Sequence, residues 1–232
     1  MKGKYRYTIL GLLFLATTIN YIDRQIIGLL KPTLEKEFSW TEKDYSNIVF
    51  WFQSMYAAGY LLAGRFVDFV GAKIGYALAV FFWSLAAMAH AFVRTITGFN
   101  FVRGALGFSE GGNFPAAIKA IAEWFPVKER AFASGIMISG TTVGPILAPM
   151  MVLWLSNRWG WQFSFLITGS MGLIWLFAWI IFYNTPTKSR NLSYQELKYI
   201  DEENKIDRVG NKTPLSMLLS KKRPGASSSQ HF

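Results

Sequence analysis

In Phe101-Val-Arg-Gly-Ala-Leu-Gly-Phe-Ser-Glu-Gly-Gly-Asn-Phe-Pro115, two charges interrupt an otherwise apolar run. Arg103 and Glu110 are seven residues apart, close to two helical turns, so both side chains point to one side of a helix. A charge near the middle of a membrane helix costs about 2.5–3.5 kcal/mol on insertion scales, so it usually faces a partner or a wet cavity. Gly107 and Gly111, four residues apart, allow a neighbouring helix to approach closely. We therefore expect this helix to line a polar interior.

The rest of the chain is built from long apolar blocks. Of the 232 residues, 52% are hydrophobic and 17% aromatic. About 20 apolar residues cross a bilayer, and six blocks reach that length. They cover residues 7–30, 48–66, 74–93, 97–118, 131–155 and 163–183. The first block is too long for a signal peptide and has no small-x-small cleavage site. The sequence predicts an all-α membrane protein with six transmembrane helices.

The basic residues indicate the orientation of these helices. The net charge of +10 could suggest nucleic acid, but the lysines and arginines lie between the apolar blocks and accompany no base-reading motif. Most of the 24 basic residues lie at the N-terminus or follow the second, fourth and sixth blocks. By the positive-inside rule, both termini are cytoplasmic. We expect a multi-pass protein of the cell inner (plasma) membrane that binds no nucleic acid.

A second pair of charges lies in the first block, within Asn20-Tyr-Ile-Asp-Arg24. Asp23 and Arg24 fall at a depth that overlaps that of Arg103 and Glu110, because the first and fourth helices run in opposite directions. Two positive and two negative charges at one depth can neutralise each other. The two helices also open consecutive three-helix sets, as in the inverted repeats of transporters. Two interpretations stay open: a structural charge network that holds helices in register, or a functional cavity.

The second block and the loop after it add further candidates. Tyr56 lies well inside the block, where it is either an ordinary membrane aromatic or a ligand. The loop reads Gly64-Arg-Phe-Val-Asp68-Phe-Val-Gly71-Ala-Lys73. Its glycines permit a tight turn, and Asp68 can accept hydrogen bonds from the start of the next helix. We interpret Gly64, Asp68, Gly71 and Lys73 as a conformational latch.

Enzyme chemistry has little support in the sequence. The chain has no cysteine, which excludes disulfides and thiolate chemistry. His90 is the only histidine within the apolar blocks and has no second histidine or carboxylate at ligand spacing, so we expect no metal site. There is no nucleophile–base pair and no phosphate-binding loop. We predict a protein that is not an enzyme and binds no cofactor.

Together these motifs resemble the major facilitator superfamily and, within it, the anion:cation symporter family, which includes bacterial hexuronate, glucarate and galactonate carriers. Gly64-xxx-Asp68-xx-Gly71-x-Lys73 resembles the superfamily's loop signature, with departures at Phe69 and Ala72, where basic residues are usual. The match to sugar-acid carriers is carried by Asn20-Tyr21-x-Asp23-Arg24, Arg103-xxx-Gly107, Glu110 with Phe114-Pro115, and Trp124-Phe-Pro-x-Lys-Glu-Arg130. The resemblance covers roughly residues 5–215.

The resemblance implies a role for each charged residue. Arg24 would bind the substrate carboxylate, with Tyr21 and Tyr56 contacting the substrate nearby. Asp23 and Glu110 would take and release the coupling protons. Arg103, also counted with the substrate site, would tune Glu110. The implied partners are a small organic anion such as a hexuronate, and protons rather than sodium ions.

The chain divides into three predicted regions. Residues 1–183 form the six-helix bundle, and residues 184–215 a cytoplasmic central loop in which Ser193-Tyr-Gln-Glu196 opens a short amphipathic helix. Residues 216–232 are basic and serine-rich, so we expect disorder, as in a frameshifted or truncated end.

Because carriers of this family have twelve helices, with the substrate site between two halves, three hypotheses for the native chain stay open. It is an N-terminal fragment that is inactive alone, a half-carrier that assembles with a second copy or a separate second half, or a membrane scaffold without transport activity.

Overall fold

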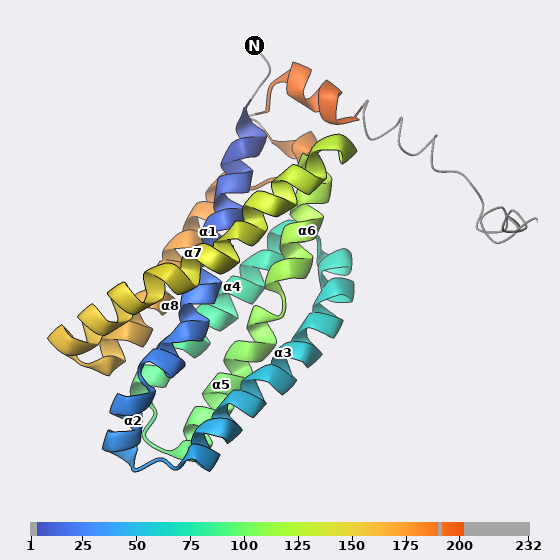
Figure 1. Ribbon diagram of the computed structural model, residues 1–232. Coiled ribbons are helices and arrows are strands. Elements are labelled where there is room, and N and C mark those ends of the chain that lie inside the picture. Colours follow the sequence, from blue (N-terminus) through green and yellow to red (C-terminus); the bar gives the residue numbers. More distant parts are fainter. Residues whose placement is uncertain (1–3, 190–191, 202–232) are drawn as a thin grey trace, which may run out of the picture.

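The protein is an elongated bundle of α-helices (Figure 1). The computed structural model describes residues 4–189 and 192–201. Within those ranges it contains no strand, which confirms the predicted all-α class. The α-helices are α1 (Tyr5–Leu29), α2 (Lys31–Phe38), α3 (Glu42–Val70), α4 (Ala72–Ala89), α5 (Ile96–Glu110), α6 (Asn113–Trp124), α7 (Val127–Trp159) and α8 (Trp161–Phe182). Two 3-10 segments, His90–Phe92 and Pro186–Lys188, follow α4 and α8.

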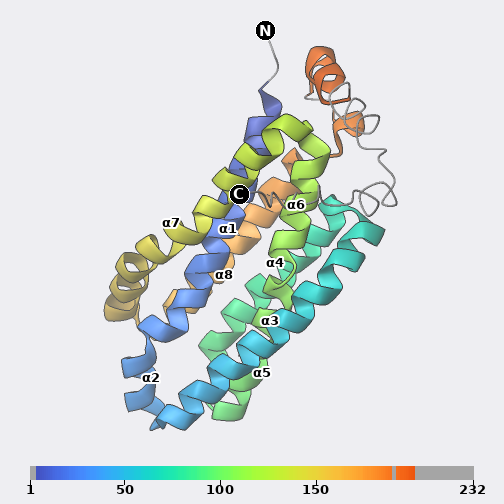
Figure 2. The same cartoon turned by 45° about the vertical axis from the view of Figure 1, so that its right-hand side comes forward.

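The long helices pack in neighbouring pairs that are distant in sequence. Helix α1 lies along α7 and also contacts α8, while α3 lies along α5, and α4 joins the two groups through α5 and α8 (Figures 1 and 2). The start of α1 and the helical residues 194–201 share one end of the bundle, and α2 lies at the other (Figure 1). The charged residues of α1 and α5 therefore face the interior from two different pairs of helices.

The predicted fourth span, residues 97–118, is divided in two. Helix α5 ends at Glu110 and α6 begins at Asn113. Gly111 and Gly112 lie between them, and the Gly112 amide donates to the carbonyl of Ser109, a tightened final turn. Glycine is among the weakest helix formers, and two in succession end the helix directly after Glu110. The single continuous helix that we predicted was wrong at this point.

By length and composition alone, three helical stretches of the described chain are apolar enough to cross a membrane: Ala72–Phe92, Val127–Trp159 and Trp161–Phe182. Of the others, α1 and α5 carry buried charged residues, and α3 carries charged residues near both of its ends. Each of the six predicted spans nevertheless corresponds to a long helix or, for the fourth, to the α5–α6 pair. The predicted architecture of a six-helix half-bundle is confirmed.

Helices α3 and α5 approach each other through glycines. A Cβ atom added to Gly107 would lie 2.4 Å from the carbonyl oxygen of Phe52, and one added to Gly59 would lie 2.1 Å from that of Phe108. Gly111 is equally confined, with the amide nitrogen of Tyr60 at 2.5 Å from its would-be Cβ. No side chain fits at these positions. The close approach that Gly107-xxx-Gly111 predicts is therefore present, and α3 is the helix that makes it.

Replacing Gly107 with alanine should destabilise the bundle. The new methyl group meets backbone rather than a flexible side chain, so α3 and α5 must separate, which costs about 1–3 kcal/mol as an overpacking change. Thermal unfolding of the purified chain in lipid nanodiscs measures this loss. Gly104→Ala in the same helix is the control, because its Cβ would meet only Met55 Cγ at 3.4 Å. Equal unfolding temperatures for the two variants would contradict the close packing.

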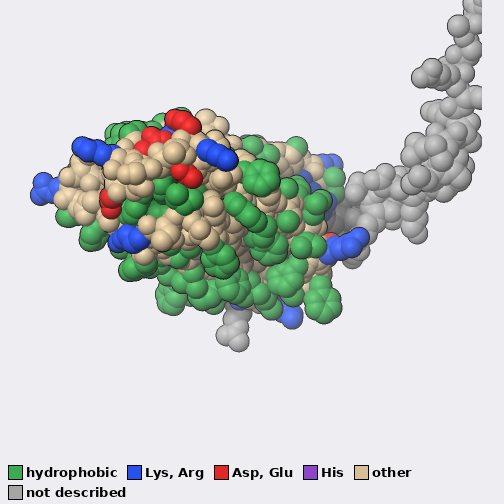
Figure 3. Space-filling view, turned by 90° about the horizontal axis from the view of Figure 1, so that it is seen from below, with side chains coloured by type: hydrophobic (Ala, Val, Ile, Leu, Met, Phe, Trp, Pro, Cys, Tyr) green, Lys and Arg blue, Asp and Glu red, His purple; other side chains and the backbone are tan. Residues whose placement is uncertain are grey.

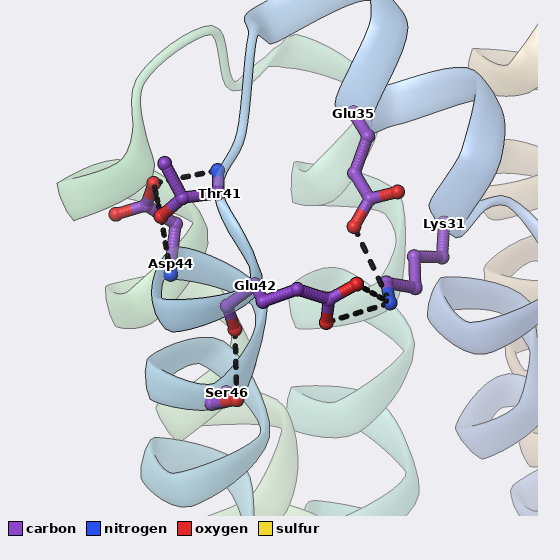
Figure 4. Close-up of polar contacts among 6 residues, drawn as sticks. All are labelled: Lys31, Glu35, Thr41, Glu42, Asp44 and Ser46. Carbon is purple, nitrogen blue, oxygen red and sulfur yellow. Dashed lines mark hydrogen bonds and ion pairs between the residues drawn. The ribbon is translucent and has the colours of Figure 1, made fainter.

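The connection from α1 to α3 contains a helix that the sequence did not suggest, α2. A capping box fixes the start of α3: the Asp44 amide donates to Thr41 Oγ1, and the Thr41 amide donates to Asp44 Oδ2 (Figure 4). Lys31 reaches from α2 to both carboxylate oxygens of Glu42, and these contacts raise the pKa of Lys31. Charged side chains gather at this end of the bundle (Figure 3).

At the opposite end, residues 194–201 pack as a helix against α1. The Glu196 amide donates to Ser193 Oγ, the contact that the capping-box pattern predicts. Arg6 lies between Glu129 at 3.1 Å and Glu196 at 3.7 Å, which ties this helix to the starts of α1 and α7. The remainder of the predicted central loop and the predicted disordered tail, residues 202–232, lie outside the described residues.

Candidate functional site

An ion pair between α1 and α5 forms the centre of the candidate site. Arg24 Nε donates to Glu110 Oε2 at 2.8 Å. The Glu110 side chain is fully buried, and the Arg24 side chain is 17% exposed. Glu110 is the last residue of α5, at the break before α6, where the backbone is no longer continuously hydrogen-bonded. The pair therefore joins a partly accessible cation to a buried acid.

Aromatic rings surround the Arg24 guanidinium. Its Cζ atom lies 4.6 Å from the ring centroid of Tyr21 and 4.3 Å from that of Tyr56. Both tyrosines are only partly buried. A cation over an aromatic face is attracted by the ring quadrupole, most strongly away from water. The structure thus brings together Tyr21, Arg24, Tyr56 and Glu110, four of the residues predicted for the site.

Arg103 belongs to the same cluster but makes different contacts. Its Nη2 donates to the backbone oxygen of Arg24 at 3.0 Å, and its Cζ lies 4.6 Å from the ring centroid of Phe52. Arg103 is 3% exposed, and no ion pair within 4.0 Å joins it to a carboxylate of the described residues. Arg24, and not Arg103, is thus the direct partner of Glu110.

Asp23 is buried and 1% exposed. Thr168 of α8 lies near it, and Arg103 and Glu110 are within electrostatic range. Within the described chain, neither of its carboxylate oxygens accepts a hydrogen bond of good geometry. Burying a polar group without a hydrogen-bond partner costs free energy. A bound proton, water molecule or ligand at the Asp23 carboxyl group would reduce that cost.

The cluster has unused donors and acceptors. In the described residues, Arg24 Nη2, Arg103 Nε and Arg103 Nη1 are buried donors without a hydrogen-bond acceptor, and Glu110 Oε1 is an acceptor without a donor. Guanidinium groups bind carboxylates through paired N–H donors. The arrangement can therefore receive a carboxylate on its arginines and exchange a proton at Glu110.

Two hollows of the described surface lie away from the charged cluster. One of about 310 Å³ is lined by apolar residues of α3, α4 and α5, and one of about 530 Å³ lies between α3 and α5 beside Trp51 and Phe101. Neither is lined by the four charged residues. The candidate site is therefore defined by the chemistry of the charged cluster and not by either hollow.

The predicted latch residues do not form the loop that we expected from the sequence: Gly64 and Asp68 lie in α3, Lys73 lies in α4, and only Gly71 lies between the two helices. Gly71 has φ +84°, a conformation that favours glycine, and it separates the two helices. We expected Asp68 to accept a hydrogen bond from the start of α4. Its Oδ1 instead accepts a hydrogen bond from Lys119 Nζ of α6 at 3.0 Å. Lys73 donates to Asn184 Oδ1 at 2.8 Å, and Gly64 has open space around it. Residues distant in sequence thus contact both sides of this connection: Lys119 contacts the end of α3, and Asn184 contacts the start of α4.

Sequence reasoning missed three residues of these clusters: Phe52, Thr168 and Lys119. Phe52 lies four residues before Tyr56, one helical turn away, which could have indicated a second ring on the same face. Lys119 and Thr168 carry no such signal, because their contacts depend on how α6 and α8 pack.

The bundle combines two features of secondary transporters. It buries opposite charges between its helices, and one helix is interrupted directly after a buried carboxylate. The model of the Major Facilitator Superfamily matches residues 13–225, and the chain belongs to this family. The resemblance to the N-terminal half of this superfamily's sugar-acid carriers, which we inferred from the sequence motifs, is confirmed.

Curated relatives are named as carriers of sugar acids. The chain is 36% identical over 200 residues to the galacturonate transporter of Dickeya chrysanthemi, covering 86% of this chain and 58% of the relative. It is 35% identical to the hexuronate transporter of Escherichia coli (strain K12), covering 86% of this chain and 46% of the relative. It is 33% identical to a probable galactarate/D-glucarate transporter of the same strain, covering 94% and 51%. The chain spans about half the length of the curated relatives it matches.

Solved structures agree on the fold. A bacterial homologue of the human lysosomal transporter Spinster, in an inward-facing and occupied conformation, has a TM-score of 0.67 at 22% identity, covering 78% of this chain and 45% of that one. The xylose transporter of Escherichia coli, in an inward open conformation, has a TM-score of 0.60 at 13% identity, covering 92% and 54%.

Proposed function

We propose that this chain forms the proton-coupling half of a carrier that transports an organic anion, a sugar acid such as a hexuronate, together with a proton. The observation that carries the proposal is the Arg24–Glu110 ion pair between the rings of Tyr21 and Tyr56. The printed names of the relatives support the substrate class, since they include galacturonate, hexuronate and galactarate/D-glucarate transporters.

The proposed coupling is a competition for Arg24. When Glu110 is ionised, it occupies the guanidinium; when Glu110 is protonated, Arg24 is released to bind the substrate carboxylate. Proton and anion then favour each other's binding through one pairing equilibrium. Asp23 is a second proton acceptor in this scheme, and Arg103 tunes Glu110 and adds positive charge to the substrate site.

The proposed placement follows from the charge distribution. The carrier lies in the inner (plasma) membrane with both termini in the cytoplasm, and residues 184–215 belong to its cytoplasmic central loop. The latch formed by Gly64, Asp68, Gly71 and Lys73 then lies on the cytoplasmic side. Its contact from Asp68 to Lys119 joins the end of α3 to α6, which begins directly beyond the break at Glu110.

Binding of galacturonate by an intact carrier that contains this chain as one half, purified in lipid nanodiscs, tests the proposal. We expect binding that is at least about fivefold tighter at pH 5.5 than at pH 7.5, the lower end of typical coupling factors. Galactose, which has the same ring but no carboxylate, is the matched control and should not bind. Equal binding of the two sugars, or no binding of any hexuronate at either pH, would rule the proposal out.

A further inference from the structure

The charge cluster contains an unpaired cation and an unpaired carboxylate oxygen. Within the described residues, Arg103 has no carboxylate partner, and its Nε and Nη1 have no acceptor. Glu110 Oε1 likewise has no donor, although Glu110 and Arg103 are only seven residues apart on α5 and interact electrostatically. Burying a charge without its counterion is costly. Some feature of the site must therefore hold the Arg103 guanidinium away from Glu110.

Phe52 of α3 has the position to do this. Its ring centroid lies 4.6 Å from Arg103 Cζ and 5.5 Å from Arg24 Cζ, and among the described residues it is the ring that both guanidiniums contact. Phe52 is 4% exposed, so these contacts are largely shielded from water, where cation–π attraction is strongest. The ring is also nearly parallel to that of Tyr56, at an interplanar angle of 13°.

The backbone of Phe52 is fixed as firmly as its ring. Its carbonyl oxygen is the group against which Gly107 packs, one turn beyond Arg103 on α5. The backbone that carries the ring therefore cannot shift toward α5, because it already contacts the backbone of Gly107. The second contact of Arg103, from Nη2 to the Arg24 carbonyl oxygen, directs the guanidinium toward α1.

We propose that Phe52 is a positioning residue: it retains Arg103 over its ring, and so leaves Arg24 as the only direct ion-pair partner of Glu110. The consequence for coupling rests on the proposed function. If Arg103 also paired with Glu110, ionised Glu110 would no longer need Arg24, and Arg24 could bind an anion whether or not a proton was present. Phe52 thereby makes anion binding depend on the proton.

Other titratable groups surround Arg103 and Glu110 and take part in any pH dependence. They come from α1, α3 and the 3-10 segment after α4, and they are Tyr21, Asp23, Arg24, Tyr45, Tyr56 and His90. None of them replaces the aromatic contact of Arg103. The test therefore changes Phe52 and leaves all of them in place.

The first test follows the arginine side chains directly. The chain is labelled with ¹⁵N-arginine in lipid nanodiscs, and Arg103→Lys identifies the Arg103 Nε–H signal by its loss. We expect Phe52→Leu to make this signal respond to Glu110→Gln by a much larger shift than in the wild-type background, because Arg103 then pairs with Glu110. Phe52→Tyr keeps the ring and should behave as wild type. If Phe52→Leu does not fold, Phe52→Met provides an unbranched apolar side chain for the same comparison.

A response of Arg103 to Glu110→Gln that is the same in all backgrounds would overturn the proposal. The second test measures galacturonate affinity at pH 5.5 and pH 7.5. The ratio of the affinity at pH 5.5 to that at pH 7.5 should fall at least about threefold in Phe52→Leu and be restored in Phe52→Tyr. A merely structural role of Phe52 would not produce this pattern. An unchanged ratio in Phe52→Leu would also count against the proposal. This second test uses an intact carrier that contains this chain as one half. If that wild-type carrier binds no galacturonate, the proposed function fails, while the arginine signals of the chain still decide the role of Phe52.

Discussion

In Glu110→Gln, galacturonate binding should lose its dependence on pH. Glutamine has the shape of the protonated acid but cannot ionise, so it no longer competes for the Arg24 guanidinium that lies 2.8 Å from the wild-type carboxylate. The variant should bind the anion at pH 7.5 as tightly as wild type does at pH 5.5, a gain of about 5- to 150-fold at the higher pH for typical coupling free energies. Titrations in nanodiscs at both pH values measure this change.

The same substitution separates coupling from binding in transport. In proteoliposomes that contain an intact carrier built from this half, uptake driven by a proton gradient should stop in Glu110→Gln, whereas exchange of internal for external galacturonate should continue. Glu42→Gln is the control, because the Glu42 carboxylate is 80% exposed and pairs with Lys31 at the α2 end of the bundle. Gradient-driven uptake that survives in Glu110→Gln at every pH would remove Glu110 from the coupling role.

The membrane fold could be predicted from the sequence because its signal is local. A block of about 20 apolar residues has few alternatives to a spanning helix, and each predicted block is helical. The break after Glu110 was missed because Gly111-Gly112 has two possible roles. We interpreted the glycines as a surface for close packing, which they also provide against Tyr60. Their second role, ending α5 directly after Glu110, follows from the weak helix propensity of two consecutive glycines.

The sequence predicted which charged residues form the cluster, but not which of them are direct ion-pair partners. Opposite charges at overlapping depth indicated that α1 and α5 would neutralise each other. Asp23 and Arg24, however, are consecutive on a helix and point about 100° apart, since an α-helix has 3.6 residues per turn. Which of them faces Glu110 depends on the rotation of α1, which its packing against α7 and α8 sets. No short sequence pattern predicts how α1 is rotated about its axis.

Long-range partners were missed for the same reason. Asp68 and Lys119 are 51 residues apart, and only the packing of α6 beside α3 brings them within 3.0 Å. Phe52 was passed over because aromatic residues are common in membrane helices, so a single ring carries little information. Its meaning depends on the two guanidiniums that lie over it.

Arg24→Lys should weaken galacturonate binding about 10- to 100-fold, although the charge is retained. Lysine offers a point charge in place of the planar fork of N–H donors that matches a carboxylate. It also loses the stacking of the guanidinium over Tyr21 and Tyr56, at 4.6 and 4.3 Å. A hydrogen bond to a charged group contributes about 1.5–3 kcal/mol, so the loss of one of the two guanidinium hydrogen bonds to the carboxylate accounts for this loss of affinity. Isothermal titration at pH 5.5, where competition from Glu110 is smallest, isolates the effect.

The control must distinguish a binding role from a structural one. Arg94→Lys makes the same chemical change at the end of the bundle, where Arg94 lies over Trp161 and donates to backbone oxygens, and it should leave affinity unchanged. If Arg24 only holds α1 against α5, Arg24→Lys will lower the unfolding temperature but bind galacturonate as wild type does. Loss of affinity with little loss of stability is the result expected if Arg24 binds the anion, because a lysine can still pair with Glu110 in the empty site.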